Sequence, residues 1–227
     1  MSKRMAAVAA KFDKEQVYGI QDAVALLQGM PAVKFDESID VSVKIGVDAR
    51  KHSVRGVSQL PHGSGRKVRV AVFAEGEAAK QAKEAGADLV GTEDLCDKLK
   101  KGPIDVQVVI ATPDMMGMVG KIAKVLGPKG LMPNPKMGTV TTHVAEAVLG
   151  AKKGQAAFRL DKASIIHATV GRRSFTADQI KENIAQLLAD IKKLKPASAK
   201  GQFLQKLSLS TTMGPGLTVD LKTVDTE

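Results

Sequence analysis

The strands that this sequence of 227 residues predicts are of two kinds, and the kind changes along the chain. Apolar and polar residues alternate near both ends, in "FDESIDVSVKIGVD" (35–48), "FLQKLSLSTT" (203–212) and "GLTVDLKTV" (216–224). Such alternation is typical of a strand with one buried face and one face in water. We therefore predict that these three segments are neighbours in one antiparallel sheet.

The middle of the chain shows the second kind of strand. "VRVAVFA" (68–74) and "VQVVIA" (106–111) are almost continuously apolar, and they are separated by helix-like stretches, "EAAKQAKEAGA" (77–87) and "EDLCDKLKKG" (93–102). Continuous apolar runs suit parallel strands that helices cover on both faces. The middle of the chain therefore predicts a small α/β unit.

Together the two patterns predict a mixed fold, α/β and α+β, in which one domain is inserted into another. We expect a discontinuous α+β sandwich domain from residues 1–67 and 158–227, and an inserted Rossmann-like three-layer α/β domain from residues 68–157. The chain would cross between them at "SQLPHGSGRK" (58–67) and at "FRLDKAS" (158–164). A double crossing of this kind can act as a hinge.

The clearest single helix lies in "SFTADQIKENIAQLLADIKKLKP" (174–196), after the second crossing. Thr176 and Gln179 have the spacing of a capping box, and Pro196 provides a stop. Apolar residues between them recur at helical spacing. We expect this helix to cover the sheet of the discontinuous domain.

The charge of the chain is strongly basic and unevenly divided. Its 34 Lys and Arg against 24 Asp and Glu give a net charge of +10 and a pI near 9.6. Residues 1–67 and 158–227 hold 22 of the basic and 14 of the acidic residues, whereas residues 68–157 hold 12 and 10. A basic excess favours polyanionic partners, and here it lies on the discontinuous domain.

Other function classes lack their sequence signals. No apolar run approaches the roughly 20 residues of a membrane span. The apolar part of the N-terminus is too short for a secretory signal peptide, so we expect this segment to belong to the mature protein. The single cysteine, Cys96, favours a reducing cytoplasm, and we predict no metal and no cofactor. The four histidines show no metal-ligand spacing; they are His52, His62, His143 and His167.

Enzymatic signals are also weak. "FAEGEAAK" has one glycine where a dinucleotide fold needs three, and neither "HGSGRKV" nor "GMVGKIAK" has the spacing of a P-loop. No catalytic residues suggest themselves, so we predict that the chain is not an enzyme. The alternative is an α/β enzyme or nucleotide-binding protein that acts on a phosphorylated substrate in the inserted domain. A binder of anionic membranes would need a basic amphipathic helix with aromatic residues, which the sequence lacks.

Two unusual stretches allow two interpretations each. In "ATPDMMGMVGKIAKVLGPKGLMPNPKMGTV" (111–140), we expect a helix over 115–126 whose methionines fill the core. The functional interpretation is that the lysines of this stretch contact an RNA, a second one beside any RNA bound by the basic domain. These lysines are Lys121, Lys124, Lys129 and Lys136. "STTMGPG" (210–216) is expected from local sequence to be a hairpin turn. It could also be a binding tip, since it lies in the basic domain.

These stretches, together with "KPASAKGQFLQKLSLSTTMGPG" (195–216) and "KFDESIDVSVKIGVD" (34–48), closely resemble the family of large-subunit ribosomal protein one ("L-one") in its bacterial form. The resemblance runs over essentially the whole chain. It implies a cytoplasmic two-domain protein of the large ribosomal subunit that binds large-subunit (23S) ribosomal RNA at the mobile side stalk. It further implies assistance in the release of deacylated tRNA from the exit site, and repression of its own operon through the messenger RNA leader. Other ribosomal components would be partners, and the protein would be a monomer off the ribosome.

The resemblance also implies an RNA-binding surface on the discontinuous domain. Its residues would be Lys34, Phe35, Ser38, Arg159, Asp161, Lys162, His167, Lys206, Ser210, Thr211, Thr212, Met213, Gly214 and Pro215. Hydroxyls and backbone groups can bond to 2′-OH and phosphate oxygens, and Met213 and Phe35 can contact sugar or base faces. The low aromatic content of 3% speaks against a stacking platform for single strands and favours folded RNA.

Three of these residues have alternative interpretations. Phe35 shares parity with the inward residues of its segment and could belong to the core, and His167 could be a buried histidine. Asp161 could accept from a 2′-OH or base amine, or pair with Lys162. The chain also departs from the family pattern, because Ala163 and Ser164 stand where the family usually has Thr or Asn followed by Gly.

Overall fold

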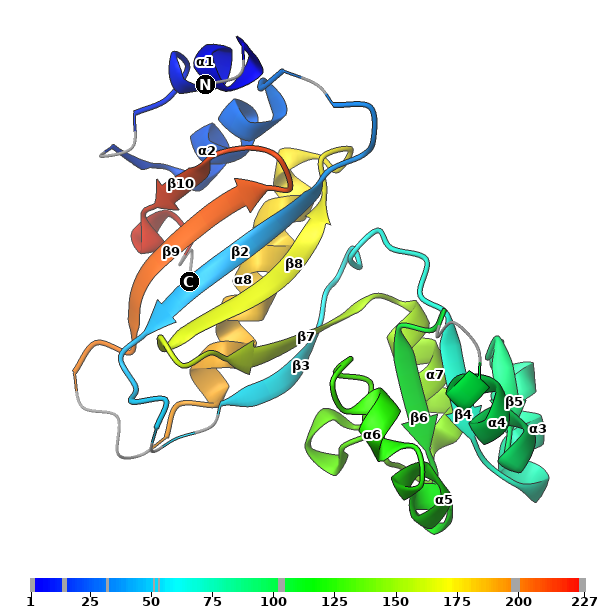
Figure 1. Cartoon of the computed structure of the whole chain (residues 1–227). Helices are drawn as coiled ribbons and strands as arrows, with labels where there is room; N and C mark the ends of the chain where they lie inside the picture. Colours follow the sequence, from blue (N-terminus) through cyan, green and yellow to red (C-terminus); the bar gives the residue numbers. More distant parts are fainter. Residues whose placement is uncertain are drawn as a thin grey trace. The chain divides into compact units, whose positions relative to one another are not determined.

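The structure is a computed structural model, and it describes most of the chain in two compact units. The described residues are 3–13, 16–31, 33–50, 52, 54–101, 105–196 and 201–224. Unit 1 consists of Met1–Gly65 and Ala156–Glu227, and unit 2 of Arg66–Gln155. Figure 1 shows a sheet with helices in each unit. The mixed α/β fold class predicted from the sequence is confirmed.

Unit 1 is built on a seven-stranded sheet with the order β1-β10-β9-β2-β8-β7-β3. The strands are β1 (Val17–Tyr18), β2 (Ser38–Ile45), β3 (Arg55–Gln59), β7 (Gln155–Leu160), β8 (Ile165–Arg172), β9 (Leu204–Thr211) and β10 (Gly216–Val219). The alternating segments are antiparallel neighbours as predicted, since β9 pairs with both β2 and β10. Strand β2 also pairs with β8, which places β2 at the centre of the sheet.

One face of this sheet carries the core of unit 1. The inward residues of β2, Ile39, Val41, Val43 and Ile45, are at most 1% exposed. Helices α2 (Ile20–Gln28) and α8 (Ala177–Lys193) pack on this face and against each other, and Figure 1 shows α8 running along it. Each fully buried aliphatic side chain contributes about 1.5 to 3 kcal/mol, so this face stabilises the unit. The short helix α1 (Lys3–Ala9) precedes the sheet in the chain.

Helix α8 forms where its sequence signals place it. The N–H of Gln179 donates to Thr176 Oγ1 over 3.4 Å, and the N–H of Thr176 donates to Gln179 Oε1 over 3.0 Å. This reciprocal pair is the predicted capping box. The helix ends at Lys193, three residues before Pro196. Its fully buried Asn183 donates to the carbonyl oxygens of Gly63 and Val170, at 3.0 and 2.7 Å, and so ties Gly63, within the first crossing, to unit 1.

Unit 2 is a three-stranded parallel sheet with the order β5-β4-β6. The central strand β4 (Val70–Phe73) and its neighbour β6 (Val108–Ala111) are the predicted apolar runs, whereas β5 (Leu89–Gly91) was not predicted. Alternate residues of β4 belong to two separate apolar clusters, one on each face of the sheet. The helices of the unit include α3 (Gly76–Glu84), α4 (Glu93–Lys101) and α7 (Val144–Lys152).

The prediction of a single helix over residues 115–126 is wrong. The chain forms a 3₁₀ turn (Pro113–Met115), then α5 (Met116–Gly120) and α6 (Ala123–Leu126). Between the two helices, the N–H of Lys121 and that of Ile122 bond to carbonyls only three residues back, which tightens the turn. Two glycines in α5 weaken helix propensity there. The segment does end at Gly127 as expected, and the methionines at 115, 116 and 118 pack against the core.

Candidate nucleic-acid interface

The sheet face of unit 1 opposite the helices carries polar and basic side chains in register. Ser208, Ser42, His167 and Arg159 lie directly opposite one another on four successive strands, from β9 to β7. His167 and Arg159 are exposed, and both serines are partly exposed. This row therefore presents two hydroxyls, an imidazole and a guanidinium along one line. We call these four residues the polar row.

The residues flanking the polar row give this face its charge. On one side of the row, Lys206 lies opposite Lys44, and both side chains are exposed. On the other side, Ser210 lies opposite Asp40, whose carboxylate accepts a hydrogen bond of 2.6 Å from Thr169 Oγ1. The one acid in this position is therefore engaged within the protein, while the lysines extend into solvent.

His167 contributes to this face from the solvent side. Its ring is exposed, and Nδ1 lies 3.1 Å from Ser42 Oγ. The interpretation of His167 as a buried histidine is wrong, because its strand position alternates with the buried Ile166 and Ala168. The ring is thus held by a neighbour in the polar row and is accessible to a ligand.

The hairpin between β9 and β10 ends in a tight turn. The N–H of Gly214 donates to the carbonyl of Thr211 over 3.1 Å, and Ser210 pairs with Gly216. The hairpin turn expected from local sequence is therefore confirmed. A Cβ on Gly214 would lie 2.2 Å from Thr211 Oγ1, so a side chain there would displace Thr211. We call residues 211–215 the tip.

The tip and the segment before β2 expose apolar and hydroxyl groups together. Met213 is 49% exposed and Phe35 is 53% exposed, and Thr212 and Lys34 are also exposed. The interpretation of Phe35 as a core residue is wrong. Strand β2 begins only at Ser38, so the alternation that places Ile39 inside does not extend back to Phe35.

Three of the expected site residues are buried instead. Thr211 faces the interior opposite Ile39 and is 4% exposed, Ser38 is 7% exposed, and Pro215 is buried. Ser38 N–H donates to Thr212 Oγ1 over 3.0 Å, and Thr212 N–H donates to the Ser38 carbonyl over 3.1 Å. These residues hold the tip against β2, while the exposed residues beside them face solvent.

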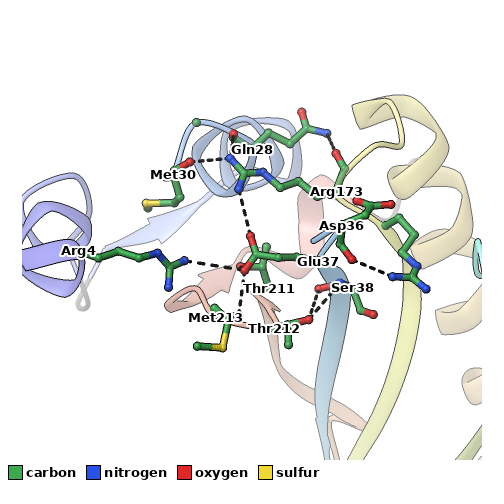
Figure 2. A network of polar contacts seen from close by, with 12 residues as sticks. Arg4, Gln28, Met30, Asp36, Glu37, Ser38, Arg173, Thr211, Thr212 and Met213 are labelled. Atoms are coloured by element: carbon green, nitrogen blue, oxygen red, sulfur yellow. Dashed lines mark hydrogen bonds and ion pairs between the residues drawn. The ribbon is translucent and has the colours of Figure 1, made fainter. Parts of the chain in front are cut away.

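A buried ion pair beneath the tip was missed by sequence reasoning (Figure 2). Glu37 is 1% exposed, and its Oε2 lies 3.1 Å from Nη1 of Arg173. Its Oε1 accepts from the Met213 N–H over 3.0 Å and from Thr211 Oγ1 over 3.4 Å. Arg4 Nη2 approaches the same oxygen at 3.9 Å. Because β2 begins only at Ser38, strand alternation gave no dependable signal that Glu37 is buried.

The turn between β7 and β8 presents the second group of expected site residues. Asp161, Lys162 and Ala163 are exposed. The Asp161 carboxylate accepts from the N–H of Lys162 over 2.7 Å, which stabilises the turn. Ser164 has a φ of +60°, a conformation that favours glycine. The departure from the family pattern therefore falls on the position where glycine would be least strained.

Replacing Ser164 with glycine is expected to stabilise unit 1 slightly, by about 0 to 1 kcal/mol. Relief of left-handed strain, about 1 to 2 kcal/mol, is partly offset by the entropy of glycine in the unfolded chain, about 0.5 to 1 kcal/mol. Valine at the same position is expected to destabilise by at least about 1 kcal/mol, because a β-branched residue tolerates positive φ poorly. Urea unfolding followed by fluorescence of Tyr18, the only Tyr in a chain without Trp, measures both. Equal stability of the two variants would contradict this account.

The alternative site in unit 2 has acidic residues after two of its three strands. Ligands of parallel α/β sheets bind at the carboxyl ends of the strands. After β4 the chain reaches Glu75, and after β5 it reaches Glu93 and Asp94 at the start of α4. Acids in these positions disfavour a phosphate group beside them. The glycine-rich cradle of a nucleotide fold is missing from the sequence as well.

The described residues also offer little for metal or covalent chemistry. They contain no group of three or more His, Cys, Asp or Glu side chains placed to hold a metal ion. Burial raises the pKa of the Cys96 thiol, so at neutral pH it stays protonated and weakly nucleophilic. None of the helices in the described part of the chain has both the length and the apolar character that a bilayer crossing requires.

Comparison with known proteins agrees with the resemblance seen in the motifs. Residues 26–215 match the model of the ribosomal protein L1p/L10e family. "Large ribosomal subunit protein uL1" of Francisella philomiragia is 57% identical over 222 residues, 97% of this chain and 96% of that protein. The protein of the same name from Acinetobacter baylyi is 55% identical over 226 residues, 99% of this chain and 98% of its own length. This chain therefore belongs to the ribosomal protein L1p/L10e family.

Proposed function

We propose that unit 1 binds large-subunit ribosomal RNA through the tip, the polar row and the turn between β7 and β8. Membership of the family makes the chain a protein of the large ribosomal subunit, cytoplasmic and not an enzyme. Contact with RNA through particular residues goes beyond family membership and is what we propose. The proposed contact residues are those at the surface: Lys34, Phe35, Arg159, Asp161, Lys162, His167, Lys206, Ser210, Thr212, Met213 and Gly214. Ser38, Thr211 and Pro215 are proposed to support the tip from within.

One observation carries this proposal: exposed apolar and hydroxyl groups lie on the same unit as several exposed basic side chains, among them Lys44, Lys206 and Arg159. Two large apolar side chains, Met213 and Phe35, are about half exposed and lie on the tip and on the segment before β2. Sugar and base faces of RNA offer apolar contacts, and its 2′-OH groups bond to hydroxyls such as that of Thr212. The basic side chains supply attraction to phosphate.

The arrangement of basic and hydroxyl side chains on unit 1 suits a folded RNA better than an arbitrary phosphate backbone. Arg159, Lys44 and Lys206 lie on the sheet face around residues that offer hydroxyl groups. Cations alone bind any phosphate backbone, whereas hydroxyls at fixed spacing add contacts that depend on the shape of the RNA. The rigid strands of the sheet fix that spacing, so a preference for one folded RNA is expected.

The remaining roles are proposed from the resemblance. We propose that the RNA is the side stalk of 23S ribosomal RNA, that unit 2 assists release of deacylated tRNA, and that unit 1 represses translation of its own operon by binding the messenger RNA leader. Lys121, Lys124 and Lys129 of unit 2 are exposed, which supports contact with tRNA. The side chain of Lys136 lies outside the described residues. Motion of unit 2 on the two crossings belongs to the same proposal, as does a monomeric state off the ribosome.

Salt dependence tests the RNA contact directly. If about six basic side chains contact phosphate, the logarithm of the association constant is expected to fall with log salt at a slope of roughly −4 to −5. Filter binding of the full chain to a transcript of the side-stalk segment measures this slope. A duplex RNA of the same length, assayed in parallel, reports the contribution of non-specific binding. A flat salt response, or equal affinity for both RNAs, would contradict the proposal.

A further inference from the structure

We propose that Glu37 is the positioning residue of the RNA-binding tip: its buried carboxylate, shared between the tip and Arg173, fixes the conformation in which Thr212 and Met213 meet RNA. This inference rests on the function proposed above. Glu37 itself is 1% exposed and cannot contact RNA through its side chain. Its influence would pass through the hydrogen bonds that it accepts.

The two carboxylate oxygens of Glu37 serve different parts of the molecule. Oε1 accepts from the tip, at 3.0 Å from the Met213 N–H and 3.4 Å from Thr211 Oγ1. Oε2 accepts from Arg173 at 3.1 Å. Figure 2 shows the carboxylate between the tip and the guanidinium. Glu37 thus connects a backbone group of an exposed loop to a side chain fixed within the unit.

Arg173 is fixed on its other side by helix α2. Its Nη2 donates to the carbonyl oxygens of Gln28 and Met30, at 2.6 and 2.5 Å. Its backbone N–H donates to the Glu37 carbonyl over 2.8 Å, and Gln28 Nε2 returns a bond of 3.3 Å to the Arg173 carbonyl. A cation at the C-terminal end of a helix is favourable. The tip is therefore tied through Glu37 and Arg173 to the last turn of α2.

Burying this pair costs desolvation energy that apolar residues would not incur. The turn itself already closes through the bond from the Gly214 N–H to the Thr211 carbonyl. The buried pair therefore acts mainly on the position of the Met213 backbone, which it holds through the bond to Glu37. A carboxylate offers acceptors on both oxygens, whereas an amide offers only one. Glutamine at position 37 could therefore serve either the tip or Arg173, but not both.

For Glu37→Gln, net charge alone predicts tighter RNA binding, whereas a positioning role predicts weaker RNA binding. Removing a negative charge from an RNA-binding domain raises its net charge and, by charge alone, strengthens binding to a polyanion. If Glu37 positions the tip, Glu37→Gln weakens binding although the protein becomes more basic. The slope of affinity against salt stays unchanged, because no phosphate contact is lost.

The test uses the full chain and the side-stalk transcript, at a temperature where circular dichroism shows each variant fully folded. Glu37→Gln is expected to weaken binding about tenfold, the size of one lost hydrogen bond to a charged group. Asp178→Asn is the matched control, since it removes the same charge from an exposed position on α8. The control is expected to bind as well as the unchanged chain or slightly better.

Glu37→Asp provides a second variant if glutamine impairs folding. It keeps the charge opposite Arg173 but is one methylene shorter, so its carboxylate cannot reach both partners. Weaker binding is again expected. Backbone hydrogen exchange provides a readout independent of RNA: the Met213 amide is expected to exchange faster in both variants, while amides in the centre of β2 keep their protection.

A double-mutant cycle separates positioning from general loss of structure. If Glu37 acts through the tip, Glu37→Gln costs less affinity in a chain that already carries Met213→Ala than in the unchanged chain, because the Met213 contact is gone and only that of Thr212 can still be lost. Full additivity of the two losses would overturn the inference, as would unchanged or tighter binding by Glu37→Gln. Failure of the unchanged chain to bind the transcript would instead overturn the proposed function, so the two failures are distinguishable.

Discussion

Replacing Arg173 with methionine is expected to lower the free energy of unfolding of unit 1 by about 3 to 5 kcal/mol. The substitution keeps much of the apolar stem but removes the cation that faces the buried Glu37 at 3.1 Å. Arg4 lies 3.9 Å from Glu37, so the buried carboxylate would keep only this longer ion pair and lose the one that is also a hydrogen bond. The two carbonyls that accept from Arg173 also lose their donor.

Urea unfolding followed by the fluorescence of Tyr18 measures this change in unit 1 alone, because Tyr18 is a buried residue of that unit. Arg172→Met is the matched control. The Arg172 guanidinium donates to the Asp36 carbonyl over 2.8 Å at the exposed side of the same segment, so its loss is expected to cost no more than about 1.5 kcal/mol. A cost below 1 kcal/mol for Arg173→Met would show that the ion pair does not stabilise the unit.

Replacing Met213 with alanine is expected to weaken binding of the side-stalk RNA by about 1 to 3 kcal/mol, the size of a lost specific nucleic-acid contact. The side chain is 49% exposed, and the hydrogen bond to Glu37 uses the backbone N–H, which alanine retains. The stability of unit 1 is therefore expected to change by less than about 0.5 kcal/mol. Met213→Ala is a cleaner test than Thr212→Ala, which would also remove the acceptor of the Ser38 N–H.

Filter binding and urea unfolding of the same preparation measure the two effects of Met213→Ala. Leu149→Ala removes an apolar side chain of similar exposure, 48%, from unit 2 and serves as the control for a general loss of surface contact. It is expected to leave binding unchanged. A loss of stability by Met213→Ala with intact RNA affinity would mean that the tip is a structural turn and no more.

Much of the fold follows from patterns that act locally. Alternation placed Val41 and Val43 inside and Ser42 and Lys44 outside, because neighbouring residues of a strand point to opposite faces. The capping box of α8 formed because both of its hydrogen bonds lie within four residues of sequence. These features depend on little beyond their own segment, and they agree with the structure.

Features that depend on distant contacts could not be predicted. Strand β5 is three residues long and gains its pairing from β4, so its own sequence carries almost no signal. The exposure of Phe35 depends on where β2 begins, which is set by pairing with β8 and β9. The hydrogen-bond partners of the Glu37 carboxylate lie 136 to 176 positions later in the chain, and single-sequence patterns do not report such contacts.

The candidate surface was predicted only in part, for the same reason. Motif resemblance indicated residues 34–38 and 206–215, but it did not separate surface residues from supporting ones. Burial makes that division: Met213 and Thr212 are exposed, whereas Thr211 and Ser38 are buried. The polar row became visible only through strand register, which joins Ser208 to Arg159 across four strands.

The central claim is that unit 1 alone recognises a folded RNA. Its core is formed within residues 12–60 and 156–224, so a chain in which a Gly/Ser linker replaces residues 66–155 is expected to fold, as circular dichroism can verify. The decisive measurement is the ratio of its affinities for the side-stalk transcript and for a duplex RNA of equal length. We predict a ratio well above one, close to that of the full chain. A folded unit 1 with no preference between the two RNAs would contradict the account.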